Sequence, residues 1–287
     1  MPINFRPLVS VIIPTYNRAT TIIKAVNSVL EQTYKNIELI VVDDCSTDNT
    51  LELLKEINDS RLSLYRLEKN SGACFARNYG FEKSNGSIIA LHDSDDYWHP
   101  NKLEKQIFFL LSNPYDFVFC GMRRIMPTGE LFYFPLSTFD CSNNFIENEL
   151  AENVISTQTM VMKRAVFEKI KFDVSFKRFQ DWDFAIRVAK DFKIGYLKEA
   201  LVDSVVQKNS ITLTISEYEA LLKLYSKYKE DIETNRTVYF SLQCKLGDSI
   251  RKIDPRKAKK HFRNALHKKT NFKILVKYIM SALKIKY

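Results

Sequence analysis

The sequence has little of what marks fibrous, disordered or membrane-spanning proteins. Its 287 residues include only seven glycines and eight prolines, without a biased tract, which excludes collagen-like and low-complexity chains. No apolar run approaches the ~18 residues that a transmembrane helix needs. Residues 2–7 also lack the basic-then-apolar pattern of a secretory signal. We therefore expect a cytoplasmic, globular protein with a substantial core.

Cysteine is scarce as well, and its spacing excludes the common cysteine-based sites. No two cysteines form a Cys-x-x-Cys pair, so the sequence predicts neither a zinc site nor a redox-active dithiol. The five cysteines are odd in number and lie far apart, which argues against a disulfide framework. We expect them to be reduced thiols.

Acidic residues are nearly missing from the C-terminal end of the chain. Residues 251–287 hold 13 lysines and arginines and a single acidic residue, Asp254, a net charge of +12, whereas the first 250 residues carry −3. The overall charge of +9 therefore averages two unlike parts. The pattern indicates an acidic or neutral body with a basic appendage.

Apolar runs and amphipathic segments alternate in the first part of the chain. Residues 8–13 and 37–42 are nearly continuous β-branched runs, typical of strands covered on both faces. Residues 20–32 between them place apolar side chains at helical spacing. A strand, a helix and a strand in this order predict a right-handed parallel crossover. The pattern repeats as far as residues 87–91, the fourth expected strand.

The alternation ends near residue 215, and the pattern that follows is helical throughout. We predict an α/β domain over residues 1–215, with a sheet flanked by helices. Residues 216–287 are expected to form a basic, all-helical extension.

Acidic side chains follow two of the expected strands, at the sheet edge where ligands bind in open α/β folds. They are Asp43, Asp44, Asp93, Asp95 and Asp96. Carboxylates crowded in this way repel one another unless a cation lies among them, and hard oxygen ligands select Mg²⁺ or Mn²⁺. A metal-bound diphosphate is the expected companion. The alternative is a solvated acidic turn, and the residues alone do not decide between the two.

Four stretches connect the chain with a known family. They read VSVIIPTYNR at residues 9–18, ELIVVDDCSTD at 38–48, NSGACFARNYG at 70–80 and GSIIALHDSDDYWHPNKL at 86–103. In these motifs and their spacing the sequence resembles the family 2 glycosyltransferases over roughly residues 8–215. The resemblance implies a GT-A fold, with a Rossmann-like, mixed, mostly parallel sheet flanked by helices. It also implies an inverting enzyme that depends on a sugar nucleotide.

The resemblance also implies a set of nucleotide-binding residues after the first strands and on the third helix. Its members are Pro14, Thr15, Tyr16, Asp44, Arg77, Asn78 and Asp93. Asp44 is expected to accept the N3 hydrogen of a uracil ring, which makes UDP the expected nucleotide. Structural alternatives stay open: Asp43 and Asp48 can brace the helix that follows them, and Arg77 can pair with a surface carboxylate.

The same resemblance implies the metal site and the catalytic base. Asp93 and Asp95 match an Asp-x-Asp motif, with Asp95 and the adjacent Asp96 as expected ligands of Mn²⁺ or Mg²⁺. In the segment FQDWDFAIR at residues 179–187, Asp181 matches the base of the family. Inversion at the anomeric carbon requires a carboxylate opposite the leaving diphosphate, where it deprotonates the acceptor hydroxyl. The structural alternative is that Asp181 caps the helix that begins here.

The last expected helix carries an apolar stripe beside its lysines. The stripe is formed by Phe272, Leu275, Val276, Ile279, Met280 and Leu283. Such a stripe packs against the body of the protein or a second subunit, giving a homo-oligomer, or it lies on anionic lipid at the inner face of the membrane. Self-association or intrachain packing is favoured, and peripheral membrane contact stays open. Nucleic acid is not expected, because no recognised nucleic-acid module accompanies the charge.

Together these features predict an inverting, metal-dependent glycosyltransferase that moves a hexose from a UDP donor onto a hydroxyl of a sugar or glycan, in polysaccharide or glycoconjugate synthesis. A sugar-nucleotide pyrophosphorylase would need a glycine-rich triphosphate loop after the first strand, where this chain has PTYNR. The non-enzymatic alternative is a degenerate relative that binds glycans or acts as a scaffold. Intact Asp44, Asp95 and Asp181 favour the enzyme.

Overall fold

The computed structural model describes residues 6–126, 128–135, 145–205 and 216–283. The chain divides into two compact units. The first comprises residues 1–143, 155–175 and 180–207, and the second comprises residues 144–154, 176–179 and 208–287. The sequence did not predict that two short internal segments belong to the helical unit. The predicted boundary after residue 215 lies outside the described residues and stays a prediction.

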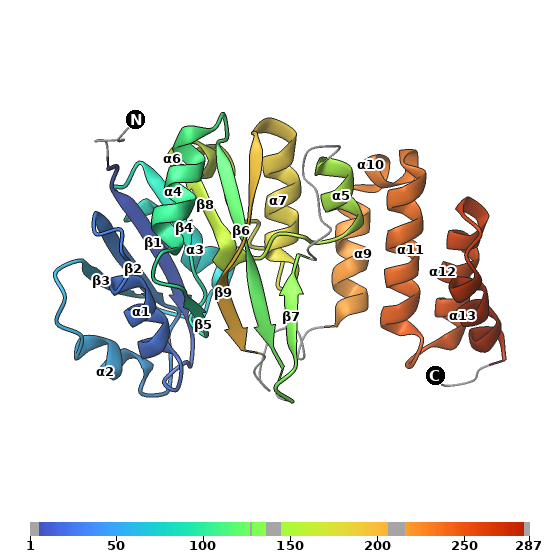
Figure 1. The fold of residues 1–287 in the computed structure, drawn as a ribbon. Coiled ribbons are helices and arrows are strands. Elements are labelled where there is room, and N and C mark those ends of the chain that lie inside the picture. The colour runs from blue at the N-terminus through green and yellow to red at the C-terminus, as the bar shows by residue number, and fades with distance from the viewer. Residues whose placement is uncertain (1–5, 127, 136–144, 206–215, 284–287) are drawn as a thin grey trace. The chain divides into compact units, whose positions relative to one another are not determined.

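The first unit is built on a mixed, nine-stranded sheet (Figure 1). In sheet order its strands are β3 (Leu62–Arg66), β2 (Ile37–Asp43), β1 (Val9–Thr15), β4 (Ile88–Leu91), β8 (Met160–Lys163), β6 (Phe117–Ile125), β9 (Ile194–Val205) and β5 (Asp96–Trp98), and β7 (Leu131–Phe134) pairs with β6. The first four strands are parallel, as the crossover pattern predicts. Strand β8 runs antiparallel to β4 and β6, and β9 is parallel to β6.

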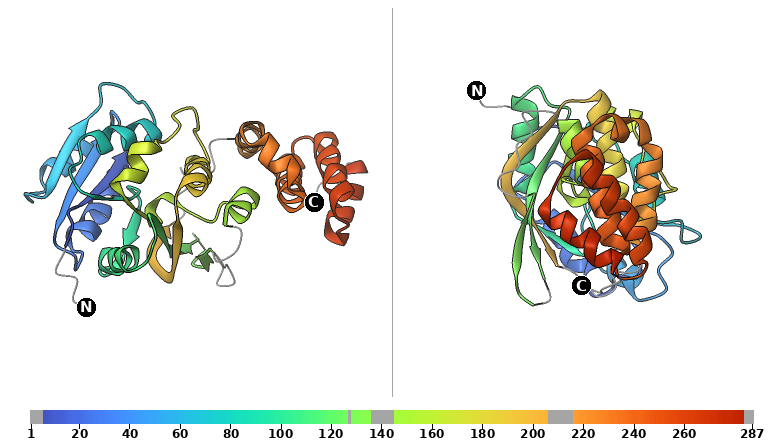
Figure 2. Two further views of the ribbon diagram at one scale, coloured as in Figure 1. Left: turned by 90° about the horizontal axis from the view of Figure 1, so that it is seen from above. Right: turned by 90° about the vertical axis from the view of Figure 1, so that its right-hand side faces the viewer.

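Helices cover both faces of this sheet (Figure 2, left). They are α1 (Ile22–Leu30), α2 (Thr50–Lys55), α3 (Ala73–Glu82), α4 (Lys102–Ser112), α6 (Arg164–Lys169) and α7 (Gln180–Asp191), with a short 3-10 helix at Thr157–Thr159. Side chains of α1 and α4, such as Val26 and Ile107, join the core on one face. On the other face Ala76 of α3 packs with Ile40 and Val42 of β2. The predicted α/β architecture is confirmed.

The central strands are apolar on both sides because both sides are buried. In β1, Val11 and Ile13 belong to the core beneath α1 and α4, while Ile12 points toward α3. Gly80 allows the close approach of α3, since a Cβ atom there would lie 2.6 Å from Cγ2 of Ile12. The apolar runs in the sequence are continuous because these strands are buried on both faces of the sheet, with neither face exposed to solvent.

The second unit consists of helices, as the sequence predicts for the C-terminal part of the chain. They are α5 (Phe145–Ala151), α9 (Glu217–Lys227), α10 (Lys229–Thr234), α11 (Arg236–Ile250), α12 (Pro255–Lys268) and α13 (Phe272–Ala282). Phe262 of α12 anchors a small core with Ala258, Ala265 and Ile274. Among the described residues, no helix has the length and apolarity needed to cross a membrane.

One residue of the first unit's core conflicts with its surroundings. Lys102, at the start of α4, is completely buried, and its Nζ atom has no hydrogen-bond partner among the described residues. The Nζ atom lies 3.7 Å from the centroid of the Trp98 ring, a cation–π contact. Burial lowers the pKa of Lys102 from 10.5 to about 8. At neutral pH the folded protein therefore holds a largely dehydrated charge.

Replacing Lys102 with Met should stabilise the first unit by about 1–3 kcal/mol at pH 7, because the variant no longer buries a charge. Between pH 8 and 10.5 the unfolded wild-type chain binds more protons here than the folded chain. Wild-type stability should therefore rise with pH across this window, whereas the variant should lack this rise. Urea unfolding at several pH values measures both effects.

Lys105→Met is the matched control, because Lys105 lies on the same helix, 39% of its side chain is exposed and it pairs with Glu199. This control should change stability little. A Lys102→Met variant no more stable than the wild type at pH 7 would contradict the assignment of Lys102 as a destabilising buried charge.

Candidate active site

The carboxyl ends of the parallel strands bring the sequence motifs to one edge of the sheet. Thr15 at the end of β1 is in register with Asp43 at the end of β2, and the backbone N–H of Asp44 donates to the carbonyl oxygen of Thr15 at 2.8 Å. Strand β4 pairs with β1 on its other side and leads directly into the segment from Asp93 to Asp96. The three strand-end motifs are therefore neighbours.

Asp44 is a buried carboxylate that organises the loop before α3. Its two oxygens accept hydrogen bonds from the backbone N–H groups of Ser71 and Gly72, each at 2.7 Å. Gly72 has φ +89°, a conformation that side chains disfavour. Burial raises the pKa of Asp44, and the neighbouring charge of Asp43 adds to this, against the two hydrogen bonds. Each oxygen retains a lone pair for a further donor.

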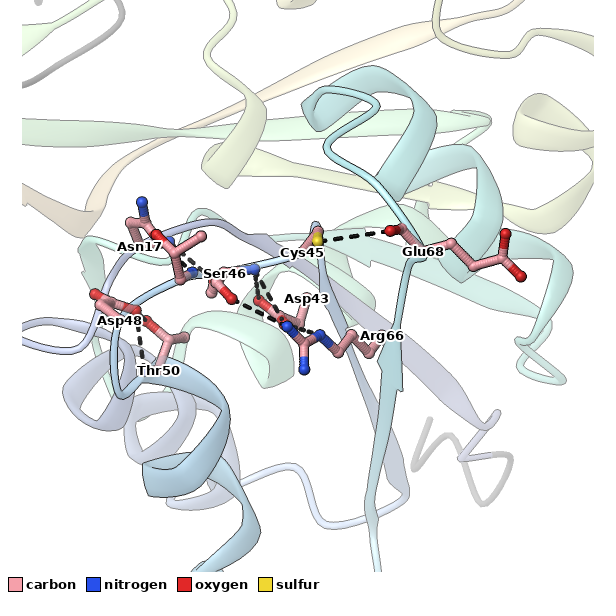
Figure 3. Close-up of polar contacts among 9 residues, drawn as sticks. Asn17, Asp43, Cys45, Ser46, Asp48, Thr50, Arg66 and Glu68 are labelled. Atoms are coloured by element: carbon pink, nitrogen blue, oxygen red, sulfur yellow. Dashed lines mark hydrogen bonds and ion pairs between the residues drawn. The ribbon is translucent and has the colours of Figure 1, made fainter.

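The loop after β2 is braced by side chains rather than left open (Figure 3). Asp43 accepts from the backbone N–H of Ser46 at 3.2 Å, and Asp48 accepts from the backbone and the hydroxyl of Thr50. The carbonyl oxygen of the Asn17 side chain accepts from the backbone N–H of Thr47 at 2.8 Å, which ties this loop to the end of β1. Asp43 and Asp48 thus have the bracing contacts of the structural alternative.

Arg77 on α3 joins two motifs that lie about 90 residues apart in the chain. Its guanidinium donates to Asp93 at 2.7 Å and to the side-chain oxygen of Gln180 at 2.8 Å. It also lies 5.2 Å from the centroid of the Phe172 ring. Arg77 is only 5% exposed, and its carboxylate partner Asp93 is a partly exposed residue of the acidic motif. The guanidinium of Arg77 therefore connects the acidic motif and the first turn of α7 through two hydrogen bonds.

Asn78, the next residue on α3, is used by the protein backbone. Its amide nitrogen donates to the carbonyl oxygen of Phe172, and its amide oxygen accepts from the backbone N–H of Phe172, both at 2.9 Å. These contacts fix the segment that precedes α7 against α3. The nucleotide contact expected for Asn78 stays a prediction.

The three carboxylates of the acidic motif lie in different environments. The side chains of Asp93 and Asp95 are 27% and 24% exposed, whereas Asp96 is buried and accepts a hydrogen bond from Ser204 of β9. Burial raises the pKa of Asp95, and the charge of Asp93 raises it further. The pKa of Asp96 is raised well above its usual value by burial and by both neighbours. The motif is an acidic cluster short of positive charge.

Arg18 is a contact of this cluster that the sequence analysis missed. Its Nε atom lies 3.5 Å from a carboxylate oxygen of Asp95. Arg18 is the last residue of the stretch VSVIIPTYNR, so its place in the first motif could have marked it as a residue of the site. The partner could not be named from sequence, because the two residues come from different strand ends.

Asp181 lies in the first turn of α7, one residue after the helix begins at Gln180, so it is not at the cap position. One of its oxygens accepts from the backbone N–H of Trp182 at 2.9 Å. Arg77 of α3 donates to the side chain of Gln180, the residue before Asp181. The first turn of α7, with Asp181, is therefore next to the helix that carries Arg77.

Asp183, the other acidic residue of this turn, is buried in an ion pair within the helix. Its side chain is 1% exposed and pairs with Arg187 one turn later at 2.7 Å. This ion pair on the helix leaves Asp181 as the partly exposed carboxylate of the two.

The residues at the end of β1 differ in their access to a ligand. Pro14 is buried within the strand, opposite Val42 of β2. Thr15 is 2% exposed, and its hydroxyl has no hydrogen-bond partner among the described residues. Tyr16 is 40% exposed. Of the three, Tyr16 has the surface needed to border a base, and the nucleotide contacts of Pro14 and Thr15 stay predictions.

The histidine beside the acidic motif packs in the core. His92 is fully buried, and its ring lies 4.4 Å from that of Trp98. Burial lowers the pKa of His92 well below its usual value, and the charge of Lys102 lowers it further. Trp98 is also fully buried and donates to the carbonyl oxygen of Gln158. The Trp98 ring lies against Lys102 at the start of α4.

The acidic motif fits a metal ion that takes most of its ligands from elsewhere. No three histidine, cysteine or acidic side chains converge as a cage within the described residues. Mg²⁺ is usually bound through one or two carboxylates, with phosphate oxygens and water completing its shell. Asp95 is partly exposed and meets Arg18 only at 3.5 Å, so its carboxylate suits this arrangement. Asp96 is buried toward β9 and is less accessible.

A curated relative is similar to this chain over most of its length. The chain is 32% identical over 227 residues to the UDP-Glc:alpha-D-GlcNAc-diphosphoundecaprenol beta-1,3-glucosyltransferase WfgD of Escherichia coli, covering 79% of this chain and 87% of that protein. The similarity therefore covers most of both chains.

Two solved structures share the fold. TarS 1–349 of S. aureus, in complex with UDP-GlcNAc, aligns with a TM-score of 0.68 at 21% identity, covering 95% of this chain and 88% of that chain. The mannosyltransferase PcManGT of Pyrobaculum calidifontis, in complex with GDP-Man and Mn²⁺, aligns with a TM-score of 0.66 at 18% identity, covering 99% and 82%. At these identities the likeness shows the GT-A type of fold.

The family model described as Glycosyl transferase family 2 matches residues 10–171, more than half of the chain. The match includes the ends of β1, β2 and β4 and the α3 segment that carries Arg77. With its fold, its strand-end carboxylates and a relative that shares a third of its residues over most of both chains, the protein belongs to glycosyl transferase family 2.

Proposed function

We propose that the protein transfers a hexose, with inversion, from a UDP donor to a hydroxyl group of a glycan acceptor. The observation that carries the proposal is the position of Arg77, which binds Asp93 of the acidic motif and Gln180 beside Asp181. These two hydrogen bonds of Arg77 support a single site, in which the donor diphosphate binds near the base. By its name, the relative WfgD is a glucosyltransferase with UDP-Glc and a GlcNAc-diphosphoundecaprenol as its substrates, which supports a sugar-containing acceptor.

The donor is proposed to bind at the ends of β1 and β2. The free lone pairs of Asp44 suit the N3–H group of uracil, and the exposed ring of Tyr16 suits a base stacked beside it. The relative WfgD uses UDP-Glc, and the TarS structure contains UDP-GlcNAc. These two names support UDP as the nucleotide. The donor sugar is glucose for WfgD and N-acetylglucosamine in the TarS structure.

Asp95 is the proposed metal ligand, with Asp93 held back by its ion pair to Arg77. A bound Mn²⁺ or Mg²⁺ would neutralise the charge that develops on the departing diphosphate. The Mn²⁺ in the PcManGT structure supports a divalent ion in this fold. In this chain, the raised pKa of Asp95 reflects burial and repulsion that a cation would relieve.

Asp181 is the proposed base. The carboxylate takes the proton from the acceptor hydroxyl as its oxygen attacks the anomeric carbon, while the bond to the diphosphate breaks on the opposite face. The carboxylate need not form a bond to the sugar, so one displacement gives inversion. Asp181 is partly exposed in the first turn of α7.

Asp181→Asn should leave UDP binding unchanged while turnover falls by about 10²–10⁴-fold, because the amide cannot accept the proton. The measurement is UDP release across a panel of UDP-sugars and glycan acceptors, with UDP binding followed by calorimetry. Asp191→Asn is the control, since Asp191 ends the same helix and pairs with Lys169. Normal turnover in Asp181→Asn would refute the base. No turnover of the wild type on any donor would favour a degenerate, glycan-binding protein instead.

Asp95→Asn should remove the dependence of UDP binding on Mn²⁺, because the amide is a poor ligand for a hard cation. Calorimetric titration of UDP with Mn²⁺ and with EDTA measures this dependence. Asp59→Asn is a closely matched control: Asp59 also pairs with an arginine, and its side chain is 24% exposed, as is that of Asp95. If Asp95→Asn keeps the full response to Mn²⁺, the metal is held elsewhere.

A further inference from the structure

The last described helix of the second unit keeps most of its apolar side chains in solvent. The outer face of α13 is formed by Phe272, Leu275, Val276 and Ile279, and Leu283 continues it. The exposed fractions of these five side chains run from 38% to 78%. We call them the α13 stripe. Residues 272, 275, 276, 279 and 283 are spaced so that they share one side of a helix.

The opposite side of α13 is already in use. Ile274 and Ser281 are buried, and Ile274 joins the small core around Phe262 of α12. In this unit α13 packs on α12, α12 on α11 and α11 on α9, so α13 is the outermost helix of the series (Figure 1). The α13 stripe is therefore not the face that holds the helical unit together.

The segment of the chain that contains the α13 stripe is strongly basic. Residues 251–283 contain eleven lysines and arginines and one acidic residue, Asp254. Four exposed members of this set, Lys252, Lys260, Arg263 and Lys273, have no carboxylate partner within the described part of the chain. An exposed apolar stripe in a segment rich in unpaired cations is complementary to a surface that is apolar below and anionic above.

We infer that the α13 stripe, together with the basic side chains of residues 251–283, forms a docking surface for an anionic lipid bilayer. The 11 residues of α13 span about 16 Å, roughly half the hydrocarbon thickness. The helix would therefore lie in the plane of the interface. Phe272 and Ile279 enter the acyl region, and Lys273 beside them extends toward the lipid phosphates.

The positive charge and the exposed apolar side chains together favour a lipid bilayer over a second copy of the chain or a nucleic acid. A second copy of the chain would bring the same eleven cations of residues 251–283 against the first set, which repel at close range. A nucleic acid would satisfy the cations and leave the α13 stripe in water. Anionic lipid satisfies both features with one surface. The inference does not rest on the proposed function, because vesicle binding is measured without donor or acceptor.

Flotation of the full chain with vesicles tests the inference. Binding to vesicles that contain phosphatidylglycerol should be at least about tenfold stronger than to vesicles of phosphatidylcholine alone, since each basic side chain near the surface adds to the attraction. Raising the salt concentration from about 0.1 M to about 0.5 M should weaken binding, because the screening length shortens.

The variant Leu275→Asp/Ile279→Asp should lose most of this binding, because it places carboxylates in the α13 stripe. Leu222→Asp is the matched control: Leu222 on α9 is 38% exposed and Leu275 is 39% exposed. Circular dichroism checks that both variants keep their helices. For the charge, Lys260→Glu/Arg263→Glu should bind more weakly than Lys229→Glu, an exposed control on α10.

Three outcomes would overturn the inference. The first is equal binding by wild type and Leu275→Asp/Ile279→Asp. The second is self-association in sedimentation velocity that the double variant abolishes, without vesicle binding by the wild type, which would make a second copy the occupant. The third is salt-sensitive binding to duplex DNA or RNA without binding to phosphatidylglycerol vesicles.

Discussion

The arrangement of the site depends on one buried guanidinium. Arg77 is 5% exposed and reaches Asp93 on one side and Gln180 on the other. A planar, permanently charged fork can hold two partners in fixed directions, which a lysine cannot do. Since removing one partner from such a charge is costly, α3, the acidic motif and the start of α7 keep their relative positions. The position of Asp181 follows from this anchoring.

The same edge of the sheet has an excess of negative charge that the protein only partly compensates. Asp96 is buried beside Ser204, Asp93 is paired with Arg77, and Asp95 has Arg18 at 3.5 Å. Burial and mutual repulsion raise the pKa of Asp95. A protein that needed only stability would replace such a cluster with apolar residues. Its retention next to a partly exposed edge is consistent with a cation and a diphosphate as partners.

Local sequence patterns predicted the strands and the strand-end motifs, but they did not predict which distant residues contact one another. The apolar runs identified the parallel strands, because double burial leaves a continuous signature. The motifs also identified the residues that meet at the strand ends. Sequence could not show that Asn78 holds the backbone of Phe172, or that Arg18 faces Asp95, since both contacts join distant segments. The same reason applies to segment 144–154, whose membership in the helical unit is set by tertiary packing.

The central claim is that Asp93 and Gln180 act through Arg77 as one unit. A double-mutant cycle of Asp93→Asn and Gln180→Leu on kcat/KM for UDP release tests it most directly, because each substitution removes one partner of the guanidinium. We expect a coupling energy of about 1 kcal/mol or more, with the double variant losing clearly less or clearly more than the sum of the single losses. Additive losses would contradict the account, since they would mean that the two residues contribute independently.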